Sequence, residues 1–86
     1  MKTFTIYADP GHAWVKVPMN ELRKLNIADR ITPYSYMRNT DAYLEEDMDL
    51  ATFVMAYRAH YNSTPKFNER HTNKSSKIRS YNSYRA

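Results

Sequence analysis

The residues best suited to chemistry are a histidine near the N-terminus and a run of acids in the middle of the chain. His12 follows Asp9 by three positions, and the acids are Glu45, Glu46, Asp47 and Asp49. Carboxylate oxygens bind hard cations, and a carboxylate close to an imidazole can serve general acid–base catalysis. Such a site requires the turn that contains His12 to lie beside the end of a strand at Glu45.

Every member of this set also has an ordinary structural role. Asp9 begins a turn sequence, Asp49 is the expected N-cap of a helix, and the glutamates would keep an edge strand soluble. The chain contains no cysteine, no glycine-rich phosphate loop, no paired histidines of the metalloprotease type and no nucleophile elbow. We therefore predict no catalytic residue, no metal ligand and no cofactor. An enzyme built on His12 and the acids is kept as the third functional hypothesis.

Aromatic and basic side chains on the predicted strands form a second candidate site. Its members are Trp14, Lys16, Tyr34, Tyr36, Arg38 and Tyr43. Strand alternation places Trp14 and Tyr43, with one or both of the other tyrosines, on the sheet face turned away from the core. Tyrosine, tryptophan and arginine dominate binding hot spots, and aromatic rings stack on unpaired bases. We interpret the set as a partner-binding face. The alternatives are core packing, cover by the C-terminal residues, and self-association of two copies.

The net charge of +4 is concentrated at the C-terminal end of the chain. Residues 1–64 carry seven Lys and Arg against eight Asp and Glu, a net of −1, whereas residues 65–86 have a net of +5. The basic residues of the second stretch are Lys66, Arg70, Lys74, Lys77, Arg79 and Arg85. A basic arm of this kind binds phosphates or an acidic protein surface, or it is a solvated end without a partner.

Hydropathy and turn residues predict the elements that must position these groups. Alternation over residues 2–8 and 13–17, separated by turn residues 9–12, predicts a β-hairpin in which Gly11 is free to take a positive φ. Apolar residues at helical spacing predict a short helix from Pro18 to a left-handed Asn26, and a longer helix from Asp49 to about Asn62. Two further strands are expected over residues 31–37 and 42–45.

The element order ββαββα predicts an α+β fold of two layers, in which two helices cover one face of a mainly antiparallel four-stranded sheet. We place a compact domain at residues 1–64 and a basic, low-complexity, extended arm at residues 65–86. The N-terminus lacks the apolar run of a signal peptide, and no stretch approaches the roughly 20 apolar residues of a membrane span. A cytoplasmic protein without membrane contact is the expectation.

The chain resembles a group of small uncharacterised proteins of tailed phages and prophages. The similarity lies in residues 9–14 (DPGHAW), 17–18 (VP), 31–36 (ITPYSY) and 43–49 (YLEEDxD), with Asn26 where glycine is expected in such relatives. The resemblance implies a phage or mobile-element origin and carries no activity. Because small phage proteins often bind a host component, it also implies action inside the host cell.

Three functional hypotheses follow. The leading one is a non-enzymatic protein that binds a host protein or a protein–nucleic-acid complex, with inhibition of host defence as one consequence. The second is direct binding of nucleic acid by the same aromatic residues and the basic arm. The third is the small enzyme described above. Self-association into a homo-oligomer stays open.

Overall fold

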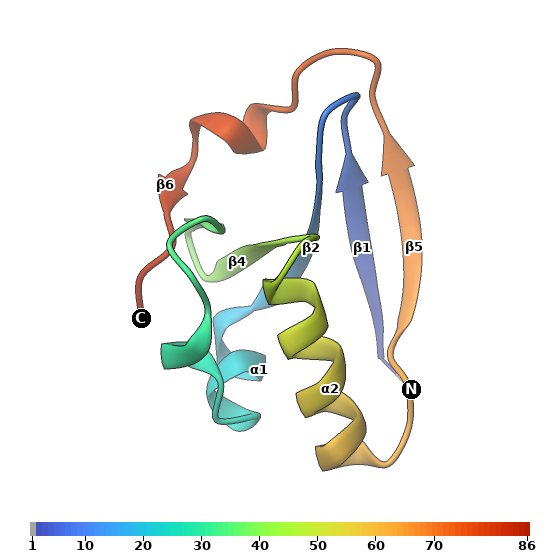
Figure 1. Ribbon diagram of the computed structural model, residues 1–86, viewed down its shortest axis with the longest axis vertical. Coiled ribbons are helices and arrows are strands. Elements are labelled where there is room, and N and C mark those ends of the chain that lie inside the picture. Colours follow the sequence, from blue (N-terminus) through green and yellow to red (C-terminus); the bar gives the residue numbers. More distant parts are fainter. Residues whose placement is uncertain (1) are drawn as a thin grey trace.

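A six-stranded mixed sheet runs through the computed structural model, which describes residues 2–86 (Figure 1). The strands are β1 (Thr3–Ala8), β2 (Ala13–Pro18), β3 (Tyr36–Arg38), β4 (Asp41–Glu45), β5 (Lys66–His71) and β6 (Asn82–Ser83). Their order across the sheet is β5-β1-β2-β4-β3-β6, and every pair is antiparallel except β1 with β5. The α+β class is confirmed. The predicted sheet of four strands is wrong, because two more strands extend it and one of them is parallel.

β1 and β2 form the predicted hairpin, with Tyr7 opposite Trp14. The Asp9 carboxylate closes the turn, since its Oδ1 accepts hydrogen bonds from two turn amides at 2.9 Å. No glycine in residues 2–86 has a positive φ, so Gly11 does not use the freedom expected of it. A Cβ at Gly11 would instead lie 2.9 Å from Nη2 of Arg79. A side chain at this position would therefore displace the end of the Arg79 side chain, which is bonded to Asp9.

Two α-helices and two short 3-10 helices complete the fold. They are α1 (Met19–Lys24), η1 (Ala28–Arg30), α2 (Asp49–Tyr61) and η2 (Lys77–Ser80). α1 follows Pro18, whose missing N–H is not needed at a helix start, and Asn26 beyond its end has the expected positive φ of 60°. α2 ends at a left-handed Asn62, φ 56°. Both predicted helices are confirmed, and no helix within residues 2–86 is long and apolar enough to cross a membrane.

The strand predicted over residues 31–37 is much shorter in the structure. Only Tyr36–Arg38 forms β3, and residues 32–35 make a turn. Neither Thr32 nor Pro33 has a backbone amide free to donate to a neighbouring strand. The Thr32 amide donates to the Asp49 carboxylate at 3.0 Å, and Pro33 has no amide to donate.

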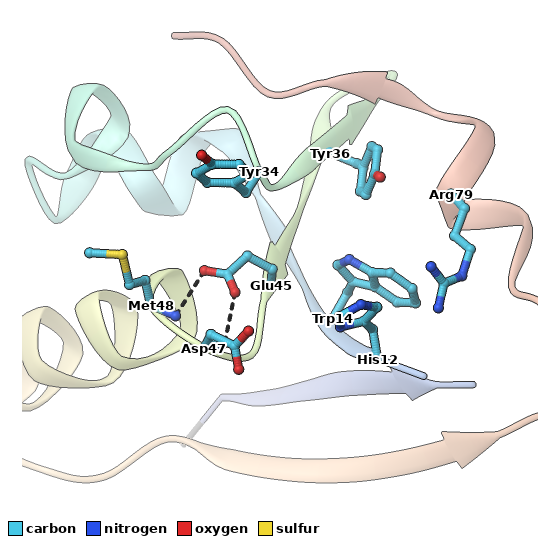
Figure 2. Close-up of a pocket in the computed structure, with 8 residues that line it drawn as sticks. All are labelled: His12, Trp14, Tyr34, Tyr36, Glu45, Asp47, Met48 and Arg79. Carbon is cyan, nitrogen blue, oxygen red and sulfur yellow. Dashed lines mark hydrogen bonds between the residues drawn. The ribbon is translucent and has the colours of Figure 1, made fainter. Parts of the chain in front are cut away.

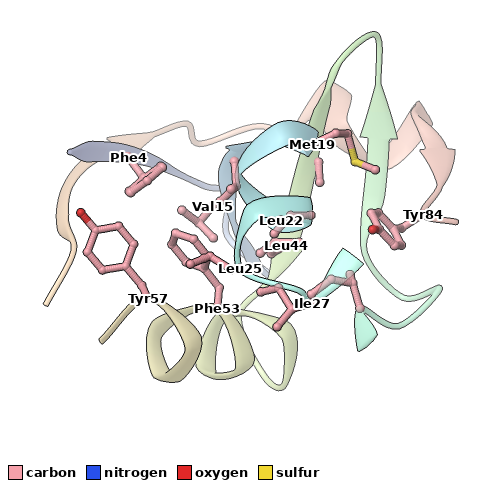
Figure 3. Close-up of a cluster of buried hydrophobic side chains, with 13 residues drawn as sticks. Phe4, Val15, Met19, Leu22, Leu25, Ile27, Leu44, Phe53, Tyr57 and Tyr84 are labelled. Carbon is pink, nitrogen blue, oxygen red and sulfur yellow. The ribbon is translucent and has the colours of Figure 1, made fainter. Parts of the chain in front are cut away.

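The main core lies between the helices and one face of the sheet (Figure 3). Alternate strand residues such as Phe4, Val15 and Leu44 point into it, as predicted, and are buried. Phe53 of α2 packs edge-to-face on Phe4, with the ring centroids 5.0 Å apart, and Leu22 of α1 joins the same cluster. Both helices therefore share one core with the same sheet face.

Two C-terminal segments, β5 and β6, are built into the sheet. β5 extends one edge beside β1, and β6 extends the other edge beside β3. Between these strands the chain passes over the turn end of the β1–β2 hairpin and forms η2 (Figure 1). The extended arm predicted from composition is therefore not confirmed, because backbone pairing holds both ends of this stretch.

A smaller buried cluster lies on the other face of the sheet. It consists of Trp14, Tyr43 and Ile78 of η2, with Tyr36 and Tyr81 partly buried against it. The centre of the predicted aromatic face is thus covered by C-terminal residues. Cover of this kind is one of the alternatives that the sequence left open.

Candidate functional site

A pocket of about 330 Å³ lies where β4 ends and β2 begins (Figure 2). We call it the aromatic pocket; its lining residues are His12, Trp14, Tyr34, Tyr36, Glu45, Asp47, Met48 and Arg79. β2 and β4 pair with Trp14 opposite Glu45, so the turn with His12 does lie beside the end of β4. Three of the four predicted aromatic residues therefore share one pocket with His12 and Glu45.

The aromatic pocket has a buried floor and an exposed rim. Trp14 is only 3% exposed and meets Tyr36 edge-to-face, with the ring centroids 6.2 Å apart. Tyr34 and Met48 are 77% and 63% exposed. Figure 2 shows both on the side of the pocket away from Arg79. This rim presents apolar surface without a covering side chain.

Glu45 is committed to the entry of α2. Its carboxylate accepts hydrogen bonds from the backbone amides of Asp47, Met48 and Asp49 at 2.7–2.8 Å. These amides would otherwise be the unpaired donors of a helix start, where a negative charge is also favoured by the helix dipole. Glu45 thus performs the capping role that the sequence assigned to Asp49.

Asp49 is 1% exposed and anchors the segment that carries the pocket tyrosines. Its carboxylate accepts from the Thr32 hydroxyl at 2.7 Å and from the Ser35 hydroxyl at 2.5 Å. Ser35 in turn accepts from the Glu45 amide at 2.9 Å. Because Tyr34 lies between the two anchored residues, this network fixes the position of its backbone.

An ion pair joins the hairpin turn to η2. Arg79 donates from Nε to Asp9 Oδ2 at 2.7 Å and from Nη2 to Oδ1 at 2.9 Å, and its guanidinium lies 5.3 Å from the centre of the Trp14 ring. The Ser76 amide also donates to Asp9 Oδ2, at 2.9 Å. Hydrogen bonds from Arg79, and next from the Ser76 amide, hold the pKa of Asp9 well below its usual range.

Stability is expected to fall as the pH drops below about 4. The Asp9 carboxyl of the unfolded chain titrates near its ordinary pKa of about 3.9, whereas the folded pKa is lower. The ion pair therefore stabilises fully above the unfolded pKa, and its contribution is lost as the pH falls towards the folded pKa. Burial acts to raise the pKa of Glu21, but hydrogen bonds from Lys2 and Tyr61 outweigh it and lower the pKa, which adds to the effect. Urea unfolding between about pH 5 and pH 2 checks this; a pH dependence unchanged by Asp9→Asn would contradict the role of Asp9.

A second pocket, of about 430 Å³, is predominantly basic. We call it the basic pocket; it is lined by Tyr7, Lys16, Arg38, Asn39, Asp41, Tyr43, Arg70, Ser76, Lys77, Ile78 and Tyr81. It brings Lys16, Arg38 and Tyr43 of the predicted partner-binding face together with Arg70 and Lys77 of the predicted arm. Burial raises the pKa of Tyr43 to about 12, so this phenol keeps its proton at neutral pH. Sequence alone put these groups in two separate sites.

The remaining predicted basic residues lie elsewhere. Lys66 begins β5 and Lys74 lies in the loop after it, and both are exposed. Arg85 follows β6 and lines a further hollow with Met37 and Asn39. The structure therefore does not gather the six basic residues of the predicted arm into one site.

Sequence reasoning missed two residues of the aromatic pocket. Met48 is an apolar residue between acids in a turn, and this local contrast is the signal that would have drawn attention to it. Arg79 was placed in a basic arm, but its partner Asp9 is 70 positions away, so no local pattern links the two.

The described part of the chain holds no group of three or more His, Asp or Glu residues arranged to bind a metal ion. Comparisons with models of protein families, with curated proteins and with solved structures found no match to this chain.

Proposed function

We propose that this chain is a non-enzymatic binding protein of the phage type, which engages a host protein, free or complexed with nucleic acid, through the aromatic pocket. The observation that carries the proposal is the exposed pair Tyr34 and Met48 beside the buried Trp14. Large side chains exposed next to a well-packed floor are typical of the centre of a protein interface.

The rim is also held in place before any partner arrives. Asp49 and Ser35 anchor the segment of Tyr34, and Glu45 anchors the turn of Met48 through its backbone amide. A fixed backbone lowers the entropy lost on association, so more of the contact energy appears as affinity. Inhibition of a host defence component is the role we propose for this binding.

The same contacts support a role without catalysis. A general base must reach the proton that it removes, and the Glu45 carboxylate is engaged by three backbone amides. Asp49 is buried and already accepts from Thr32 and Ser35. His12 also lines the pocket, but neither Glu45 nor Asp49 is free to pair with it.

Substitution of Tyr34 or Met48 by alanine is expected to weaken partner binding by about thirtyfold or more, the loss typical of a hot-spot residue. Tagged protein would be used to capture partners from extracts of the bacterial host, and the dissociation constant would then be measured with the purified partner. Met55 on α2 is 72% exposed and lines neither of the two pockets, so Met55→Ala is the matched control.

Two results would overturn this proposal. The first is an equal loss of affinity in Met55→Ala, which would show that any exposed methionine matters. The second is a homodimer, seen by light scattering, that Tyr34→Ala dissociates. In that case the rim is a contact between copies of this chain rather than a site for a host protein.

A further inference from the structure

The basic pocket concentrates positive charge in one place. Four cationic side chains and one carboxylate line it, a net formal charge of +3, although residues 1–64 are slightly acidic as a whole. The cations come from β2, β3, β5 and η2, so only the folded chain brings them together. Like charges in one pocket repel each other unless an anion joins them.

Internal partners neutralise little of this charge. Lys16 approaches Asp41 at 3.7 Å, a long contact in which the Lys16 side chain is 41% exposed. Arg38 stacks over the Tyr81 ring at 5.0 Å and donates to its hydroxyl, but a phenol carries no charge to balance it. Within residues 2–86, neither Arg70 nor Lys77 forms a salt bridge.

Aromatic rings lie among the cations. Tyr43 meets Tyr81 edge-to-face with the ring centroids 5.0 Å apart, and its ring is tilted against that of Tyr7 at 6.4 Å. Tyr7 and Tyr81 are only partly buried, which leaves part of their ring surface within reach of a ligand. The pocket of about 430 Å³ falls within the range that small organic ligands occupy.

We propose that the basic pocket binds single-stranded nucleic acid, with phosphates on Lys16, Arg38, Arg70 and Lys77 and one base against the partly exposed ring of Tyr7 or Tyr81. Cationic grooves with aromatic platforms are the common design of proteins that bind single strands without reading their sequence. An acidic protein surface would satisfy the charges, but a single strand matches both features, since its phosphates meet the cations while an unpaired base stacks on a neighbouring ring. This site shares no lining residue with the aromatic pocket, and the proposal does not rest on the host protein proposed there.

The test uses the intact chain and a fluorescently labelled oligothymidylate, with binding followed by anisotropy over a series of salt concentrations. The double variant Arg70→Gln/Lys77→Gln removes two exposed cations. Each lost phosphate contact is expected to lower the slope of log affinity against log salt by about 0.7, so the double variant loses about 1.4. The matched control is Arg30→Gln/Arg58→Gln, which removes the same charge from exposed positions on η1 and α2. It is expected to leave the slope nearly unchanged.

A second variant tests the rings rather than the charge. Tyr7→Leu removes a stacking surface and is expected to weaken oligonucleotide binding by about fivefold to a hundredfold, whereas Tyr7→Phe retains affinity. Circular dichroism would check that both variants are folded.

Three outcomes would overturn the proposal. They are no oligonucleotide binding at low salt, an equal loss of slope in the control pair, and binding of a polyglutamate peptide as tight as that of the oligonucleotide. The last outcome would assign the pocket to acidic proteins. None of them affects the Tyr34 and Met48 test of the aromatic pocket.

Discussion

Replacement of Asp9 by asparagine is expected to detach η2 and β6 from the sheet while the hairpin turn survives. The asparagine oxygen can still accept from the two turn amides, as Oδ1 does now. Its amide nitrogen would replace Oδ2 and would face the Ser76 amide and Arg79 Nε, both of which are donors. A buried position with donors on both sides and no acceptor is strongly unfavourable.

Trp14 reports this detachment directly, because it is the single tryptophan of the chain and is 3% exposed beneath the C-terminal residues. Loss of η2 is expected to shift its fluorescence towards that of a solvated indole and to open residues 72–86 to proteolysis. Arg79→Met should give the same two effects, and the double variant should add little to either single change. Asp29→Asn on the exposed η1 is the control. A buried Trp14 in Asp9→Asn would show that Ile78 and β6 hold the cover without the ion pair.

Replacement of Asp49 by alanine is expected to lower the free energy of unfolding by about 3 kcal/mol or more. The carboxylate is buried and accepts from the amide and hydroxyl of Thr32 and from the hydroxyl of Ser35. Its removal leaves these donors without partners, and each buried unsatisfied donor costs about 1–3 kcal/mol. Asp49→Asn keeps one acceptor oxygen, so its free energy of unfolding should lie between those of Asp49→Ala and the wild type. Urea unfolding measures the loss, and Asp29→Ala gives the baseline for an exposed acid.

The same substitution is expected to disturb the rim of the aromatic pocket. The segment around Tyr34 would lose its anchor, and amide exchange at Glu45 should accelerate because its donor contact to Ser35 is no longer fixed. Partner affinity should fall as the segment around Tyr34 loses its fixed position. An Asp49→Ala protein that is less stable but keeps slow exchange at Glu45 would mean that the network is not what positions Tyr34.

The elements with local signals were predictable from the sequence. Alternation fixed the faces of β1 and β2, helical spacing predicted both α-helices, and the asparagine expected to end α1 does have a positive φ. These patterns depend only on neighbours along the chain, so no distant residue has to be known. Whether the turn that holds His12 lies beside Glu45 was left open by the sequence, and the long-range pairing of β2 with β4 brings the two together.

Only the tertiary structure decided how the C-terminal residues are used. β5 is exposed at five of its six residues, and β6 contains only Asn82 and Ser83, so neither has the alternation of a half-buried strand. The basic character of residues 65–86 predicted a solvated arm, but backbone pairing at both edges of the sheet and the bond between Asp9 and Arg79 outweigh that composition. Both pockets depend on this placement, since Arg79 lines one and Lys77 the other. The sequence determined which side chains share a sheet face, and long-range contacts determined that η2 covers its centre.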